Sequence, residues 1–87
     1  MKVRKKNGSI QDFNLSKIKF SIECVSDEVE MPLTGSDVEL ISLNIKRQVD
    51  SRKEDIIDTS EIHKIVIEQL EAMDYKMIAK AYDGLAG

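Results

Sequence analysis

The sequence has little of what most catalytic or metal-binding centres require. It contains one cysteine, Cys24, and one histidine, His63, which excludes an internal disulfide and a zinc site built from cysteine or histidine pairs. It has neither the G-x-x-x-x-G-K-[ST] loop of P-loop ATPases nor a G-x-G-x-x-G motif. Acid pairs such as Asp27-Glu28 lack the apolar shielding that raises a carboxyl pKa for general-acid chemistry. We therefore expect no catalytic residue, no metal ligand and no enzyme activity.

Long apolar segments are missing too. The longest runs are three residues, such as Ile65-Val66-Ile67, whereas about 20 are needed to span a bilayer. The basic start leads into Asn7-Gly8 and not into the apolar stretch of a signal peptide, so we expect a cytoplasmic protein with no membrane partner. Because Ile22 and Val25 flank Cys24, its thiol is expected to be buried and structural.

Charge is the first positive signal. Residues 1–19 carry six basic side chains and one acidic one, a net +5, whereas residues 20–87 carry seven basic and fifteen acidic ones, a net −8. A basic end on an acidic body predicts an anionic ligand at that end. It argues against a broad nucleic-acid surface, which usually needs a basic domain. The 87 residues suffice for one domain, 1–87.

The N-terminal segment predicts a β-hairpin with strands at about 2–6 and 9–12. Asn7-Gly8 favours a type I′ turn, because both residues tolerate positive φ. Val3 and Ile10 are expected on one face. Asn14 then has the character of a helix N-cap, and the apolar spacing from Leu15 to Val29 predicts an amphipathic helix that Pro32 and the acids before it end.

Three more helices are expected. Ser36 and Glu39 fit a capping box at the start of the second helix, near 35–36. Thr59 or Ser60 caps the third, and Asp74 the fourth. Ile56-Ile57 forms either a short third strand or a loop, which gives the order ββααβαα or ββαααα. Four amphipathic helices bury their apolar stripes as a bundle, with the hairpin over one end, so the fold class is α+β.

Lysines of the hairpin and the first helix form a candidate phosphate site. Lys5, Lys6 and Lys17 would converge near a helix N-terminus that already favours anions. Spacing alone favours the alternative, a solvated hairpin whose lysines discourage edge pairing. His63 lies one turn after Thr59, where its imidazole could contact a sugar hydroxyl or a phosphate; a surface histidine without a ligand fits the spacing as well.

Two sets of residues resemble the ATP-cone domain over about residues 2–83. The first is Val3-x-Lys5-Lys6-Asn7-Gly8 followed by Phe13-Asn14-x-x-Lys17-Ile18, and the second is Thr59-x-x-Ile62-His63 with the Tyr75 to Tyr82 ending. The resemblance implies a four-helix bundle capped by a small three-stranded β-sheet. It also implies a regulatory site for ATP or dATP, as in ribonucleotide reductases and in the repressor of their genes.

The resemblance carries over a set of nucleotide contacts. Val3 would line the adenine pocket and Ile18 would pack on the base. Asn14 would read adenine with Gln11 near its edge, and Thr59 and His63 would lie near the sugar and phosphates. Lys5, Lys6 and Lys17 would hold the phosphates. Lys6 and Gln11 depart from the usual arginine and acidic residue. We expect Lys6 to lower the affinity, and Gln11 to keep the adenine contact but to leave its preference open. The full set is Val3, Lys5, Lys6, Gln11, Phe13, Asn14, Lys17, Ile18, Thr59 and His63.

Neither a reductase catalytic domain nor a repressor zinc ribbon is present in the sequence. The domain is therefore expected to act through a reductase catalytic domain or another protein, or through a homo-oligomer. The choice between ATP and dATP, and whether Mg²⁺ accompanies them, stays open. Two alternatives remain: a nucleic-acid-binding module that uses Lys2, Arg4, Lys5 and Lys6, and a purely structural helical interaction domain.

Overall fold

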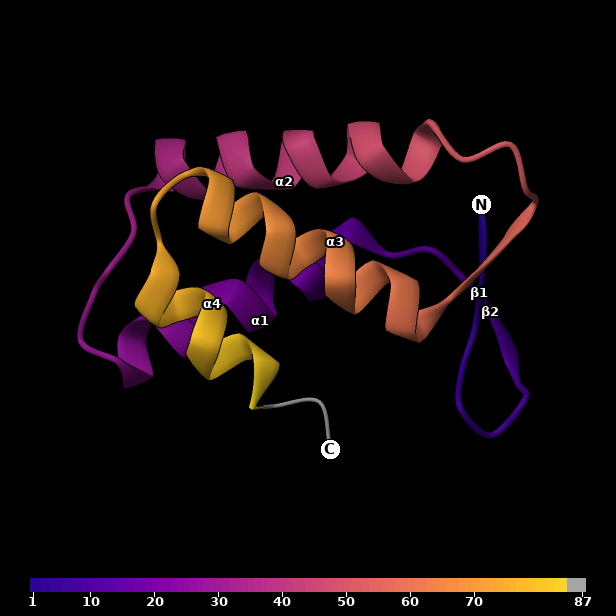
Figure 1. Ribbon diagram of the computed structural model, residues 1–87, viewed down its shortest axis with the longest axis horizontal. Helices are drawn as coiled ribbons and strands as arrows, with labels where there is room; N and C mark the ends of the chain where they lie inside the picture. The colour runs from indigo at the N-terminus through magenta and orange to yellow at the C-terminus, as the bar shows by residue number, and fades with distance from the viewer. Residues whose placement is uncertain (85–87) are drawn as a thin grey trace.

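The computed structural model describes residues 1–84 and contains four helices and a three-stranded sheet (Figure 1). The order of the elements is ββααβαα, which confirms the α+β prediction. Ile56-Ile57 forms a third strand and not a loop. The elements are β1 (Lys2–Arg4), β2 (Ile10–Asp12), α1 (Leu15–Glu28), α2 (Gly35–Asp50), β3 (Ile56–Asp58), α3 (Thr59–Ala72) and α4 (Lys76–Asp83).

The sheet has the order β2-β1-β3, with β1 antiparallel to β2 and parallel to β3. Val3 pairs with Gln11, and Arg4 pairs with Ile10. Directly opposed residues share a face of the sheet, so the expectation that Val3 and Ile10 lie on one face is wrong. Ile10 is instead 47% exposed beside Arg4, while Val3 packs against the core and brings Gln11 to its own face.

The hairpin turn also differs from the expected type I′. The Gly8 amide donates to the Lys5 carbonyl, and the Lys5 amide donates to the Ser9 carbonyl. Gly8 has a φ of +88°, but Asn7 does not have a positive φ. This is a type I turn followed by a glycine bulge, the usual three-residue hairpin loop. The Asn7 side chain supports it by accepting hydrogen bonds from the Ser9 amide and hydroxyl.

Helix ends show which sequence signals prevailed. Asn14 caps α1 as predicted, with its side chain accepting from the Lys17 amide. The capping box of α2 uses Thr34 and Asp37, not Ser36 and Glu39. Asp74 does not cap α4; with a φ of +65° it ends α3 in a Schellman motif, in which the Tyr75 amide donates to the Leu70 carbonyl. The short side chain of aspartate tolerates this left-handed conformation.

The helices bury their apolar stripes against one another, and the sheet lies over one end of the bundle (Figure 1). Ile57 of β3 is 4% exposed and belongs to the same core, so it ties the sheet to the helices. Cys24 is exposed, contrary to the expected buried thiol. Ile22 and Val25 face the core, and position 24 lies about 200° around the helix from position 22, on the outer face.

None of the helices within residues 1–84 is both long enough and apolar enough to cross a membrane.

Candidate functional site

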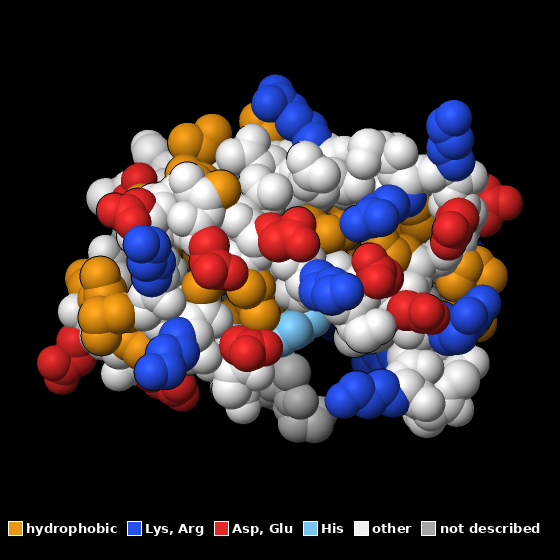
Figure 2. All heavy atoms as spheres, in the orientation of Figure 1, with side chains coloured by type: hydrophobic (Ala, Val, Ile, Leu, Met, Phe, Trp, Pro, Cys, Tyr) orange, Lys and Arg blue, Asp and Glu red, His pale blue; other side chains and the backbone are white. Residues whose placement is uncertain are grey.

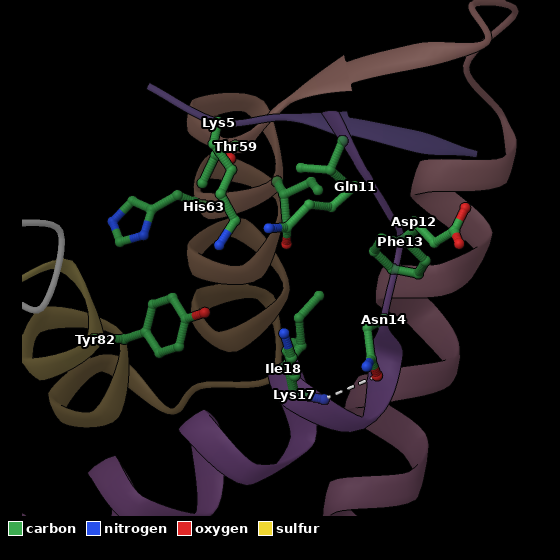
Figure 3. A pocket seen from close by; sticks show the side chains of 12 residues that line it. Lys5, Gln11, Asp12, Phe13, Asn14, Lys17, Ile18, Thr59, His63 and Tyr82 are labelled. Atoms are coloured by element: carbon green, nitrogen blue, oxygen red, sulfur yellow. Dashed lines mark hydrogen bonds between the residues drawn. The ribbon is translucent and has the colours of Figure 1, made fainter. Parts of the chain in front are cut away.

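A cavity of about 210 Å³ lies between the sheet and the bundle (Figure 3). The β1–β2 hairpin forms one wall, the first turns of α1 and α3 form two more, and Tyr82 closes it from α4. Nine of the ten residues expected to form a site line this one cavity; Lys6 does not. The lining residues are Val3, Lys5, Gln11, Asp12, Phe13, Asn14, Lys17, Ile18, Thr59, Ile62, His63 and Tyr82.

The floor of the cavity is apolar. Val3, Phe13 and Ile18 are half-buried and pack against the core, and Ile62 is 8% exposed and part of it. Such a surface favours a flat apolar group over a hydrated ion. Ile62 was not among the expected site residues, although its place one residue before His63 on the buried stripe of α3 puts it beside the cavity.

Two amides supply neutral polar groups above this floor. The side-chain oxygen of Asn14, Oδ1, accepts from the Lys17 amide at 3.3 Å, so the oxygen is committed to capping α1. The Asn14 Nδ2 group is therefore the part that can donate to a ligand. Gln11 reaches the same space because its pairing with Val3 sets it on the inner face of the hairpin.

Two lysines line the cavity without an ion pair to a carboxylate in the described part of the chain, namely Lys5 and Lys17. Neighbouring basic residues on β1 are paired across the sheet instead: Lys2 with Asp12 at 2.5 Å, and Arg4 with Asp58 at 3.4 Å. The Lys2 ammonium holds the pKa of Asp12 below its ordinary value by hydrogen bonding and charge. Of the basic residues in the β1–β2 hairpin and at the start of α1, Lys5 and Lys17 are therefore the ones placed to bind an anionic ligand in the cavity.

Lys6 lies in an open depression next to the cavity, together with Lys5, Asn7 and Thr59. Lys5 and Thr59 line both hollows, so the depression continues the cavity outward along the hairpin. Figure 2 shows the same region from outside: the histidine side chain borders a hollow, and lysine or arginine side chains stand across from it. A ligand with a base in the cavity could therefore extend a charged tail under the hairpin.

Thr59 does not cap α3, although a cap at Thr59 or Ser60 was expected. Asp58 is the N-cap and forms no side-chain cap bond, since its carboxylate faces Arg4. The Thr59 hydroxyl donates to the Arg4 carbonyl at 3.0 Å and so fastens the start of α3 to the end of β1. The first amides of α3 keep no side-chain partner at the cap, which leaves a positive helix end beside the cavity.

His63 is held by α4. Its ring stacks on the ring of Tyr82, with centroids 5.2 Å apart and planes 26° apart, and Nε2 lies 3.1 Å from Asp83 Oδ1. Burial raises the pKa of the Tyr82 hydroxyl. Tyr82 and Asp83 were not expected in the site. The spacing placed Tyr82 on the inner face of its helix, but only the packing of α4 against α3 brings it to His63.

No group of three or more histidine, cysteine, aspartate or glutamate side chains suited to a metal ion occurs among the residues that the structure describes.

Comparison with known proteins identifies the family. The family model of the ATP cone domain matches residues 1–83. Comparison with curated protein sequences gave no match. ATP-cones are regulatory and not catalytic domains, and the lining of the cavity accords with a nucleotide ligand. With nearly its whole length matched, the chain belongs to the ATP-cone family of nucleotide-binding regulatory modules.

Proposed function

We propose that this chain binds ATP or dATP in the cavity between the hairpin and the starts of α1 and α3, and that it acts as an allosteric sensor for ribonucleotide reductase or for the transcriptional control of that enzyme. The observation that carries the proposal is the joint placement of an apolar floor and the cations of Lys5 and Lys17 in one hollow. Adenine nucleotides combine the same two features: a flat base and a polyanionic tail.

The base would lie on the floor formed by Val3, Phe13 and Ile18. Adenine offers ring nitrogens that accept and an amino group that donates. The Asn14 Nδ2 group, left over from helix capping, can donate to a ring nitrogen. The Gln11 amide can donate and accept, so it suits the edge that carries both the amino group and a ring nitrogen.

The phosphates would follow the hairpin toward the open depression. Lys5 and Lys17 would contact them from two sides, with Lys6 beyond, and the α3 N-terminus adds its partial positive charge. The cavity of about 210 Å³ is smaller than the roughly 300 Å³ at which typical ligand pockets begin. It therefore suits the nucleoside, while the triphosphate lies in the depression.

Regulation requires that the nucleotide favours one conformation or assembly over another. The ATP-cone is a regulatory domain, so the signal would pass to a reductase catalytic domain, to another protein domain, or to further copies of the chain. Tyr82 and His63 link the cavity to α4, which makes α4 a route by which occupancy could be transmitted.

Isothermal titration of ATP and dATP, each with and without Mg²⁺, tests the proposal. Lys5→Ala/Lys17→Ala should weaken binding at least tenfold, because each lysine–phosphate contact contributes on the order of 1 kcal/mol or more. Lys53→Ala/Lys64→Ala removes the same charge from residues that do not line the cavity and should bind normally. A wild-type dissociation constant above the millimolar range would refute the proposal. Binding to DNA without binding to ATP would favour the nucleic-acid alternative.

A further inference from the structure

The contact between His63 and Asp83 joins two helices at the edge of the cavity. Nε2 of His63 lies 3.1 Å from Oδ1 of Asp83, while the ring face stacks on Tyr82. His63 is 22% exposed at its side chain and Asp83 is 69% exposed, so the imidazole is the more enclosed of the two. Figure 3 shows the imidazole above the Tyr82 ring and next to Lys5, at one end of the cavity.

Donor and acceptor chemistry decides which nitrogen carries the proton. An ionised carboxylate can only accept a hydrogen bond. Nε2 must therefore be the protonated nitrogen, and in a neutral imidazole Nδ1 is then an acceptor with a lone pair. Among the residues that the structure describes, Nδ1 has no hydrogen-bond partner. It is the one polar atom of His63 left for a ligand.

The tautomer limits which ligand groups the His63 side chain can bind. A phosphate oxygen only accepts hydrogen bonds, so a neutral ring with an Nδ1 lone pair has no bond to offer it. A sugar hydroxyl can donate to Nδ1. The charged groups that line the same cavity are Lys5, Lys17 and Asp12, and the two lysines are the groups suited to the phosphates.

We propose that Asp83 is a positioning residue that fixes the tautomer and ring orientation of the neutral His63 imidazole, and thereby directs this form of the ring to the ribose 2′-hydroxyl and away from the phosphates. The inference rests on the proposed function, since it concerns the same ligand. Asp83 does not line the cavity and acts only through His63. Tyr82 contributes by stacking against the ring and so restricting its orientation.

The first test needs no nucleotide. Long-range ¹H–¹⁵N spectra of the ligand-free chain at mildly alkaline pH report which nitrogen of a neutral histidine carries the proton. We expect the Nε2–H tautomer in the wild type. The carboxylate supports only the Nε2–H ring, whereas the amide of Asp83→Asn can also donate to an unprotonated Nε2, so the share of the Nδ1–H tautomer should rise. An Nδ1–H ring in the wild type, or an unchanged spectrum in the variant, would overturn the proposal.

The second test measures discrimination. Titrations with ATP and dATP give the ratio of the two affinities, and Asp83→Asn should shift that ratio against ATP by about threefold to tenfold, the range for one neutral hydrogen bond. Asp27→Asn is the matched control, because it removes one carboxylate at the far end of α1 and should leave the ratio unchanged. Thermal unfolding of each variant checks that it is folded.

The two tests separate the inference from the proposed function. If the wild type binds neither nucleotide, the proposed function fails and the sugar contact fails with it, while the spectrum still decides whether Asp83 sets the tautomer. If both nucleotides bind and the ratio is the same in Asp83→Asn and the wild type, the proposed function stands and the role of Asp83 in discrimination is refuted.

Discussion

Asn14 caps α1 with one side-chain atom and is proposed to contact adenine with another, and substitution can separate the two roles. Its Oδ1 caps α1 through the Lys17 amide at 3.3 Å, and its Nδ2 is the proposed donor to adenine. Asn14→Asp keeps an oxygen for the cap and removes the donor. Asn14→Ala removes both. Comparing the two variants therefore distinguishes an effect on folding from an effect on nucleotide binding.

The expected magnitudes follow from the geometry. An N-cap contributes about 1 kcal/mol, and a bond at 3.3 Å is slightly longer than the usual range, so Asn14→Ala should lose about 0.5–1 kcal/mol. A loss of 1 kcal/mol lowers the unfolding temperature of a domain this size by about 4–8 °C. Asn14→Asp should unfold near the wild-type temperature, because aspartate is an equally good cap and its charge suits a helix N-terminus.

Nucleotide binding should rank differently. Asn14→Asp loses the donor and sets a carboxylate against the acceptor nitrogens of the base, so affinity should fall by about 1–2 kcal/mol, or about 5- to 30-fold. Thr34→Ala is the control: it removes the cap of α2, which lies outside the cavity lining, and should lower stability without changing affinity. Calorimetric titration and thermal unfolding provide both readouts. Wild-type affinity in Asn14→Asp would refute the adenine contact, and an unfolding temperature as low as that of Asn14→Ala would refute the division between the two atoms.

Two further predictions concern stability. Gly8→Ala should destabilise the chain by about 1 kcal/mol, because φ is +88° there. Gly35→Ala in the first turn of α2 should be neutral or stabilising, since an added Cβ meets nothing within 4 Å. Equal unfolding temperatures of the two variants would contradict this prediction. Lys2 lowers the pKa of Asp12, and hydrogen bonds from the Thr34 backbone and side chain lower that of Asp37. The stabilisation that these two carboxylates give the fold is present above the ordinary pKa of 3.8 and is lost as pH falls through the lowered values. The unfolding temperature should therefore be level above about pH 5 and fall in acid. In Asp37→Asn it should fall less steeply.

The sequence predicted the four helices because their signals are local, whereas it left Ile56-Ile57 open between a third strand and a loop. Apolar spacing marks the buried faces of the helices. Ile56-Ile57 is a short β-branched pair that forms a strand where Ile57 packs into the core. The capping box was misplaced because two S/T-x-x-D/E patterns overlap: Thr34 to Asp37 and Ser36 to Glu39. Both satisfy the same chemistry, and the pattern alone does not choose between them.

The errors at the hairpin and at Cys24 have a different origin. Asn7-Gly8 suits both a two-residue and a three-residue loop, and the pairing of Arg4 with Ile10 determined which one forms. Cys24 was judged from its neighbours in sequence, but on a helix adjacent residues point in different directions. Nine of the ten expected site residues meet at one cavity. Asp12, Ile62 and Tyr82 join them there, and although the apolar spacing placed Ile62 and Tyr82 on inner helix faces, it does not say which cavity those faces border.

Polar groups around the cavity share a common arrangement. Asn14 caps a helix with its oxygen, Thr59 donates its hydroxyl proton to the Arg4 carbonyl, and His63 uses Nε2 on Asp83. Each side chain is thus oriented by a bond that belongs to the fold, and each keeps one atom or lone pair for a ligand. Because these orientations exist before the ligand arrives, binding need not order them, and less of the interaction energy is lost to entropy. The lysines differ: Lys5 and Lys17 are long and lack ion pairs within residues 1–84, so they can adjust to phosphates of different length. The site therefore combines a rigid end that suits the nucleoside with an adaptable end that suits the charge, and selectivity should depend on the first and affinity on the second.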